Sequence, residues 1–284
     1  MTALLLFSLF IVLVLFRAPI AVALAVSSMT VLFMNNGLSS LEIVTDLMYT
    51  SVAKFTLLAI PFFVLAGVIM DHIGISKRLI NFAQSLVGHR KSGIALVAVI
   101  VAIFFAAISG SGPATVAAIG GILIPAMIKN GYRKETAGGL VASAGAIGII
   151  IPPSIAFIIF ALVAGSQMNI TINRLFMAGI IPGILVGIAL YIAAIYVRKR
   201  DIKKGLYIPS EHEESLKATG KERWDAFVKA LPGLMIPVII LGGIYTGFFT
   251  PTESAVVAVV YSLIVGLFIK PKGFFKQLFV IFRE

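Results

Sequence analysis

Residues 104–115 read Phe-Phe-Ala-Ala-Ile-Ser-Gly-Ser-Gly-Pro-Ala-Thr, and residues 145–154 read Gly-Ala-Ile-Gly-Ile-Ile-Ile-Pro-Pro-Ser. Both stretches lie within apolar runs that should be surrounded by lipid. A helix satisfies its own backbone there, but Pro113 and the Pro152-Pro153 pair lack amide donors and disfavour a continuous helix. Interrupted helices at membrane depth are tolerated where they line a cavity or are buried in protein. A pair of them is typical of a transporter binding site.

The composition is that of a membrane protein with several spans. Of the 284 residues, 60% are hydrophobic and 12% are charged, and the mean hydropathy is +1.07. The net charge is +11, but the basic residues form short clusters between apolar segments, without the aromatic and basic stripe of a nucleic-acid surface. The absence of cysteine excludes disulfides, thiol catalysis and thiolate metal sites. We therefore predict an all-α polytopic membrane protein in a lipid bilayer, with no nucleic-acid partner.

Residues that could support enzyme catalysis are scarce in the apolar segments. The three histidines lie at span ends or in loops, and no Asp or Glu lies near the centre of an expected span. Ser109 and Ser111 have no candidate base beside them. Glu253 stands at an expected helix start, where a carboxylate is favoured as a cap. We therefore expect that the protein is not an enzyme.

The distribution of lysine and arginine predicts that residues 93–128 form a hairpin. If this segment enters and leaves on one side, every Lys and Arg except Lys54 and Arg174 falls on the same face. A single crossing would move each later loop to the other side and remove the bias. Each arm has about sixteen residues, fewer than the about 20 of a full span. We predict a re-entrant hairpin that opens to the cytoplasm, with its tip at residues 109–113 and the N-terminus in the periplasm.

The other apolar segments are expected to be helices in chain order. Residues 3–16 and 18–34 read as two short spans with a turn at Arg17, and one interrupted span is the alternative. Residues 35–54 and 76–87 have apolar positions at helical spacing and should lie in the membrane interface. Further spans are expected at 55–70, 175–197, 227–245 and 252–269, with a broken helix at 136–164 and a polar connection at 198–224.

An odd number of crossings before residue 198 would invert any repeat that follows. Phe16-Arg17-Ala18-Pro19 before one apolar span resembles Phe249-Thr250-Pro251 before another. We predict an inverted-repeat transporter whose second repeat is incomplete in this sequence. The predicted regions are N-terminal scaffold spans with an interfacial helix (1–72), an interfacial arm helix (73–92), a transport region (93–164), a span with a cytoplasmic connection (165–224) and the start of the second repeat (225–284).

The two breaks offer oxygen ligands and amide donors. Hydroxyl groups and unwound carbonyls can surround a hard cation such as sodium. The half-helix after Pro113 presents free N–H groups and a positive dipole end, which favour an anionic ligand group. No carboxylate is expected nearby, so the sodium site should be neutral. The candidate ion- or substrate-binding residues are Ser109, Gly110, Ser111, Gly112, Pro113, Thr115, Gly148, Ile151, Pro152, Pro153 and Ser154, with sodium assigned to Ser109, Ser111 and Ser154.

Three motifs in this order resemble the large membrane subunit of tripartite ATP-independent periplasmic (TRAP) transporters, the DctM family. They are Ser-Gly-Ser-Gly-Pro-Ala-Thr-Val-Ala-Ala-Ile-Gly at 109–120, Ile-Pro-Pro-Ser at 151–154 and Phe-Thr-Pro-Thr-Glu-Ser-Ala at 249–255. The resemblance implies a sodium-driven elevator in the bacterial inner membrane, with the hairpin tip and the Pro-Pro break forming the first sodium site. It also implies a small four-helix membrane subunit and a periplasmic solute-binding protein that delivers a carboxylate, such as a C4-dicarboxylate or sialic acid.

Two other interpretations remain open. One is a stand-alone sodium-coupled carboxylate or ion antiporter with similar hairpins. The other is a truncated, non-transporting membrane fragment, because the sequence ends before a second hairpin and a second broken helix appear. We accordingly expect that the 284-residue chain alone does not carry out coupled uptake. No side chain selects among carboxylates, and sodium is expected only as the coupling ion, without a bound cofactor.

Overall fold

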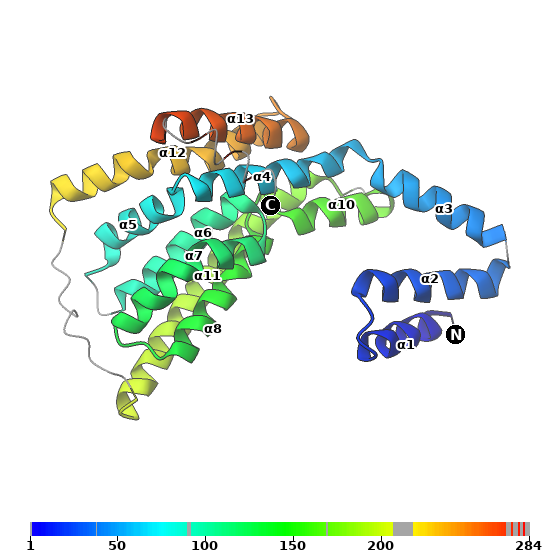
Figure 1. The fold of residues 1–284 in the computed structure, drawn as a ribbon, viewed down its shortest axis with the longest axis horizontal. Coiled ribbons are helices and arrows are strands. Elements are labelled where there is room, and N and C mark those ends of the chain that lie inside the picture. Colours follow the sequence, from blue (N-terminus) through cyan, green and yellow to red (C-terminus); the bar gives the residue numbers. More distant parts are fainter. Residues whose placement is uncertain are drawn as a thin grey trace. The chain divides into compact units, whose positions relative to one another are not determined.

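The computed structural model describes residues 2–37, 39–89, 92–168, 170–206, 218–270, 274, 278 and 281. These residues form helices and the short connections between them, with no strand in the described ranges, so the all-α prediction is confirmed (Figure 1). The chain divides into two compact units, residues 1–55 and 56–284, which are described separately.

The first unit contains α1 (Thr2–Leu15), α2 (Ile20–Asn36) and α3 (Ser39–Val52). The chain turns between α1 and α2 at Arg17, whose φ is +63°, and Pro19 stands at the N-cap of α2. Two packed helices therefore replace the alternative of one interrupted span. The predicted helix at 35–54 is also present, as α3, and its position in a membrane interface stays a prediction.

The second unit begins at Thr56, within the short 3₁₀ turn η1 (Phe55–Leu58), which leads into α4 (Ala59–His72) and then α5 (Ile75–Val87). On the predicted apolar face of α5, Leu79, Ile80 and Ala83 are buried, whereas Leu86 near its end is exposed. Two later helices cover this pair, α12 (Gly220–Tyr245) on α5 and α13 (Pro251–Ile269) on α4 (Figure 1). Thr250 and Glu253 form a reciprocal capping box at the start of α13, which confirms the predicted cap.

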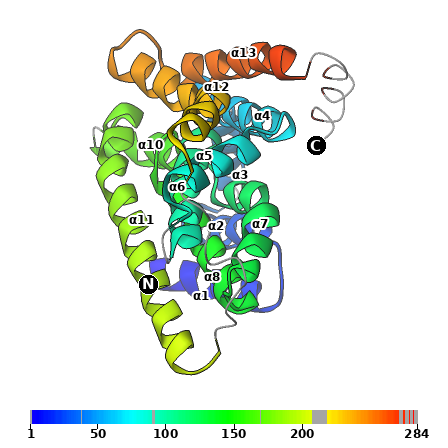
Figure 2. The same ribbon diagram turned by 90° about the vertical axis from the view of Figure 1, so that its left-hand side faces the viewer.

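Both interrupted segments lie in the second unit. The first comprises α6 (Gly93–Ser109) and α7 (Gly112–Lys129), and the second comprises α8 (Lys134–Gly145), α9 (Ile147–Ile150) and α10 (Ile155–Met168). Figure 2 shows α6 between α5, α7 and α11 (Ile172–Lys203), and α6 packs on all three. Apolar residues along α6 belong to a hydrophobic core of this unit.

The predicted polar connection at 198–224 is shorter in the structure. The helix α11 continues through Lys203 and α12 already begins at Gly220, so helical residues replace both ends of the expected loop. The middle of this connection, 207–217, and most of residues 271–284 lie outside the described residues.

Several helices are long and apolar enough to cross a membrane. Among the described residues there are five, and a sixth if the pair Lys134–Ile150 and Ile155–Ala164, bent by 43°, is taken as one broken span. The polytopic prediction is therefore confirmed. The five helical segments are Phe55–His72, Gly112–Lys129, Ile172–Lys203, Gly220–Tyr245 and Pro251–Ile269. The second of these is α7, so this arm of the hairpin is long enough to cross a membrane, contrary to the expectation from the sequence.

Candidate ion- and substrate-binding site

The tip of the hairpin is a tight turn between two helices. Gly110 ends α6 in the left-handed region, with φ +63°, and its N–H donates to Ala106 O at 2.9 Å. Ser111 caps α7, because its Oγ accepts from Ala114 N at 3.5 Å. Pro113 lies in the first turn of α7, where a missing amide donor costs no hydrogen bond. The Ser-Gly-Ser-Gly-Pro motif therefore ends one helix and begins the next.

Three oxygens converge inside this turn, and we call them the tip cluster: Ser109 Oγ, Ser111 O and Thr115 Oγ1. The Thr115 hydroxyl donates to Ser111 O at 2.8 Å and lies 3.1 Å from Ser109 Oγ. Ser109 Oγ lies 3.3 Å from Ser111 O. The Ser109 and Thr115 side chains are 2% and 0% exposed. Neutral hydroxyl and carbonyl oxygens in this arrangement are ligands that hard cations prefer.

The second break is a short extended segment between α9 and α10. Ile151 has an extended backbone (φ −74°, ψ 129°), and the Pro152–Pro153 peptide bond is cis. Ser154 Oγ donates to Ile149 O at 2.5 Å and accepts from Phe157 N at 3.3 Å. Ile151, Pro152, Pro153 and Ser154 are all buried. The Ser154 side chain thus caps α10 inside the protein.

The structure brings the tip and the break into direct contact. Ile155 N donates to Gly110 O at 3.1 Å, which joins the start of α10 to the hairpin. A Cβ atom on Gly110 would lie 2.5 Å from Pro153 O. Only glycine therefore permits the backbone of the tip to approach the Pro-Pro segment this closely.

A second close approach joins α9 to the tip cluster. A Cβ atom on Gly148 would lie 2.9 Å from Thr115 Oγ1 and 3.0 Å from Ser111 O, so α9 passes directly over the tip cluster. A Cβ atom on Gly112 would lie 2.9 Å from Gly145 O. Gly145, which is not among the predicted site residues, therefore supports the same contact.

The carbonyl groups at the breaks are less free than the sequence suggested. Gly110 O accepts from Ile155 N, Ile149 O accepts from the Ser154 hydroxyl, and Ser111 O already accepts within the tip cluster. The expectation of unwound, unpaired carbonyls is therefore wrong at these three positions, because Gly110 O is paired across the two breaks and Ile149 O and Ser111 O are each paired within their own break. A carbonyl oxygen has two lone pairs, so these atoms can still accept a second interaction.

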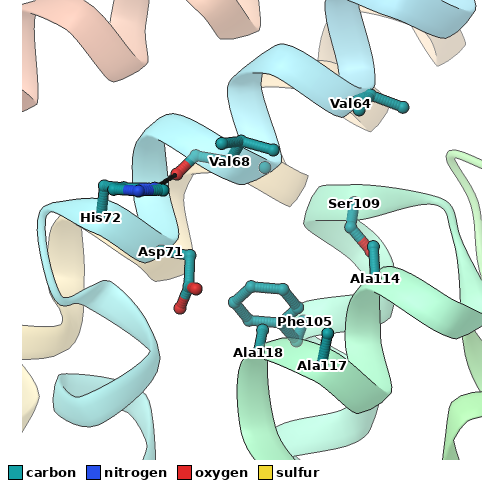
Figure 3. Close-up of a pocket in the computed structure, with 10 residues that line it drawn as sticks. Val64, Val68, Asp71, His72, Phe105, Ser109, Ala114, Ala117 and Ala118 are labelled. Atoms are coloured by element: carbon teal, nitrogen blue, oxygen red, sulfur yellow. Dashed lines mark hydrogen bonds between the residues drawn. The ribbon is translucent and has the colours of Figure 1, made fainter. Parts of the chain in front are cut away.

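A cavity of about 200 Å³ adjoins the tip between α4, α6 and α7 (Figure 3). It is lined by Ser109 and by Asp71, whose carboxylate accepts a hydrogen bond from Ser76 Oγ. Gly67 brings α4 close to the tip, since a Cβ atom there would lie 3.3 Å from Ser109 Cα. The expectation that no carboxylate lies nearby therefore needs correction. In the sequence, Asp71 is recognisable only as an acidic residue at the end of the apolar span 55–70, and it lies far along the chain from the hairpin tip.

Comparison with known proteins places the chain in a family. The model of the DctM component of tripartite ATP-independent periplasmic transporters matches residues 7–284. A C4-dicarboxylate TRAP transporter large permease protein DctM from Vibrio cholerae serotype O1 is 42% identical over 271 residues, which cover 95% of this chain and 56% of that protein.

Relatives with other named substrates are also similar to the chain. The isethionate TRAP transporter permease protein DctMQ of Oleidesulfovibrio alaskensis is 41% identical, in an alignment that covers 88% of this chain and 38% of that protein. The sialic acid TRAP transporter permease protein SiaT of Haemophilus influenzae is 37% identical, in an alignment that covers 83% of this chain and 36% of that protein. The chain thus spans about half, or less, of the length of these relatives, which are transporter permeases and not enzymes. This chain belongs to the DctM family, the large permease component of TRAP transporters.

Proposed function

We propose that the chain forms part of a TRAP permease that takes up an organic acid, driven by a sodium gradient, in the bacterial inner membrane. The observation that carries the proposal is the contact between the hairpin tip and the Pro-Pro break, which encloses buried hydroxyl and carbonyl oxygens. Family membership supports the transport function, and the geometry of this contact supports a cation at the tip.

The proposed sodium site is centred on the tip cluster. Ser109 Oγ and Thr115 Oγ1 are buried and lie beside Ser111 O, so a small rearrangement of this turn would direct three neutral oxygens at one ion. Ser154 is the fourth candidate, although its hydroxyl is already committed to capping α10. Asp71 lines the adjoining cavity and adds a negative charge to the approach of a cation.

The proposed substrate is an organic anion, with a carboxylate as the expected group. C4-dicarboxylate, isethionate and sialic acid appear in the names of the relatives, and each is an anion at neutral pH. The N-terminus of α7 lies at the tip, where the positive end of the helix dipole favours such a group. We further propose two protein partners, a small four-helix membrane subunit and a periplasmic solute-binding protein that delivers the acid.

The experiment that tests this proposal is uptake by the complete transporter reconstituted in liposomes with its binding protein. We expect a radiolabelled C4-dicarboxylate or sialic acid to accumulate under an inward sodium gradient. Replacing external sodium by potassium should abolish accumulation, because the coupling ion is then absent. Equal accumulation with potassium would contradict sodium coupling.

The proposed topology can be tested with single cysteines, because the chain contains none of its own. Lys77 precedes the hairpin, Lys129 ends it, and both are exposed, whereas Thr171 is the N-cap of α11. We expect Lys77→Cys and Lys129→Cys to react with a membrane-impermeant maleimide from the cytoplasmic side and Thr171→Cys from the periplasmic side. Labelling of Lys77→Cys and Lys129→Cys from opposite sides would show that the segment crosses the membrane completely.

A further inference from the structure

The last turns of α11 carry two buried charged side chains. Arg198 is 7% exposed and Asp201 is 4% exposed, while Lys199 and Arg200 between them are exposed. Residues three apart share one face of a helix, so Arg198 and Asp201 both point into the protein. Buried charges are costly unless they are paired and hydrogen-bonded, and their contacts therefore indicate what they hold.

Arg198 contacts both ends of the hairpin. Its Nη1 donates to Ser92 Oγ at 3.2 Å, and Ser92 is the residue at the N-cap of α6. Its guanidinium carbon lies 5.9 Å from the centre of the Tyr132 ring, within cation–π range. Tyr132 follows α7 and is 5% exposed. One side chain thus joins two positions that are separated by the whole hairpin.

Asp201 extends this contact to the next helix. Thr136, in the first turn of α8, donates from Oγ1 to Asp201 Oδ2 at 3.4 Å. Arg200 Nη2 lies 3.5 Å from Asp201 Oδ1. We call Ser92, Tyr132 and Thr136 the base of the hairpin. Together they are held by two side chains on one face of α11.

The same face of α11 also contacts the break and the first arm of the hairpin. A Cβ atom on Gly183 would clash with the Ile151 side chain. A Cβ atom on Gly187 would lie 3.0 Å from Ile103 Cδ1. Ala194, one turn before Arg198, is 3% exposed in the core around α6. A continuous surface of α11 therefore runs from the Pro-Pro break to the base of the hairpin.

We propose that Arg198 and Asp201 are positioning residues that hold the base of the hairpin together and so keep its tip aligned with the break. Arginine suits this role because its planar guanidinium can donate to a hydroxyl and stack on a ring at once, which a lysine ammonium cannot do. The consequence for transport rests on the proposed function, whereas the local effect on the hairpin does not.

Hydrogen–deuterium exchange of the purified 284-residue chain in nanodiscs tests the local effect. Arg198→Met should speed amide exchange by about tenfold in both segments of the base, 92–96 and 131–137, because the shared contact is lost. Asp201→Asn should speed exchange chiefly in the second segment, which contains Thr136. Lys199→Met is the matched control, since it removes an exposed charge from the same turn, and should change neither segment.

Two results would overturn the proposal. One is unchanged exchange of both segments in Arg198→Met, and the other is an equal rise throughout α12 and α13, which would indicate general destabilisation.

If Arg198→Met does not fold, Ser92→Ala and Thr136→Val each remove one hydrogen bond, and each should loosen only its own segment. In the complete transporter, Arg198→Lys keeps the positive charge that Arg198→Met removes. Its uptake rate should nevertheless stay below that of the wild type. A wild-type transporter without sodium dependence would contradict the proposed function and leave the exchange result valid.

Discussion

Gly110→Ala is expected to lower sodium-dependent uptake on the order of 100-fold in the complete transporter, because the tip would be displaced from the break. Gly110 has φ +63°, a region that costs an L-residue about 1–2 kcal/mol. The added Cβ would also lie 2.5 Å from Pro153 O. That oxygen belongs to the backbone, so no side-chain rotation relieves the contact. Separation of the two segments would in turn break the hydrogen bond from Ile155 N to Gly110 O.

The matched control is Gly121→Ala on α7, where the new Cβ would meet no atom within 4 Å. This substitution adds the same methyl group to the same hairpin and should leave the uptake rate unchanged. Initial uptake rates should be compared at saturating sodium and at equal amounts of protein in the membrane. Normal uptake by Gly110→Ala would show that close approach of the tip and the break is dispensable for transport.

The breaks were predictable because they depend on the glycine and proline residues within them. Glycine and proline act through their own backbone geometry, so the interruption at Ser109–Pro113 and at Ile151–Ser154 follows from nearest neighbours in the chain. The helical spacing of Leu79, Ile80 and Ala83 likewise identified the buried face of α5. Features of this kind require no knowledge of what packs against them.

Features that depend on distant contacts were not predictable. Arg198 falls in the predicted polar connection, because hydropathy cannot show that Ser92, 106 positions earlier, lies beside it. Asp71 could not be placed at the tip cavity for the same reason. The hydrogen bond between Ile155 N and Gly110 O likewise forms only when two separate breaks meet, so the pairing of Gly110 O was not predictable.

The structure also separates the serines that the sequence grouped together. Ser111 and Ser154 each accept a backbone N–H at the start of a helix, which is the contact of an N-cap. Ser109 and Thr115 instead face each other within the tip cluster. Chain position alone could not assign these roles, because all four hydroxyls lie next to a helix break.

Thr115→Val should therefore raise the sodium concentration for half-maximal uptake by about tenfold, with a smaller effect on the maximal rate, because the ion loses one oxygen ligand. Valine has nearly the shape of threonine, and the site is 0% exposed, so packing is largely retained. The measurement is the initial uptake rate as a function of sodium in the reconstituted complete transporter. Ser262→Ala is the control for a lost buried hydroxyl, because its Oγ donates to Ala258 O at 2.7 Å within α13.

Ser154→Ala distinguishes an ion ligand from a helix cap. Loss of a cap costs about 1 kcal/mol of stability. We therefore expect Ser154→Ala to lower the melting temperature while the sodium midpoint stays near that of the wild type. A raised midpoint in Ser154→Ala would return this serine to the ion site. If Thr115→Val lowers stability as Ser262→Ala does but leaves the midpoint unchanged, the tip cluster only stabilises the turn, and sodium must bind elsewhere.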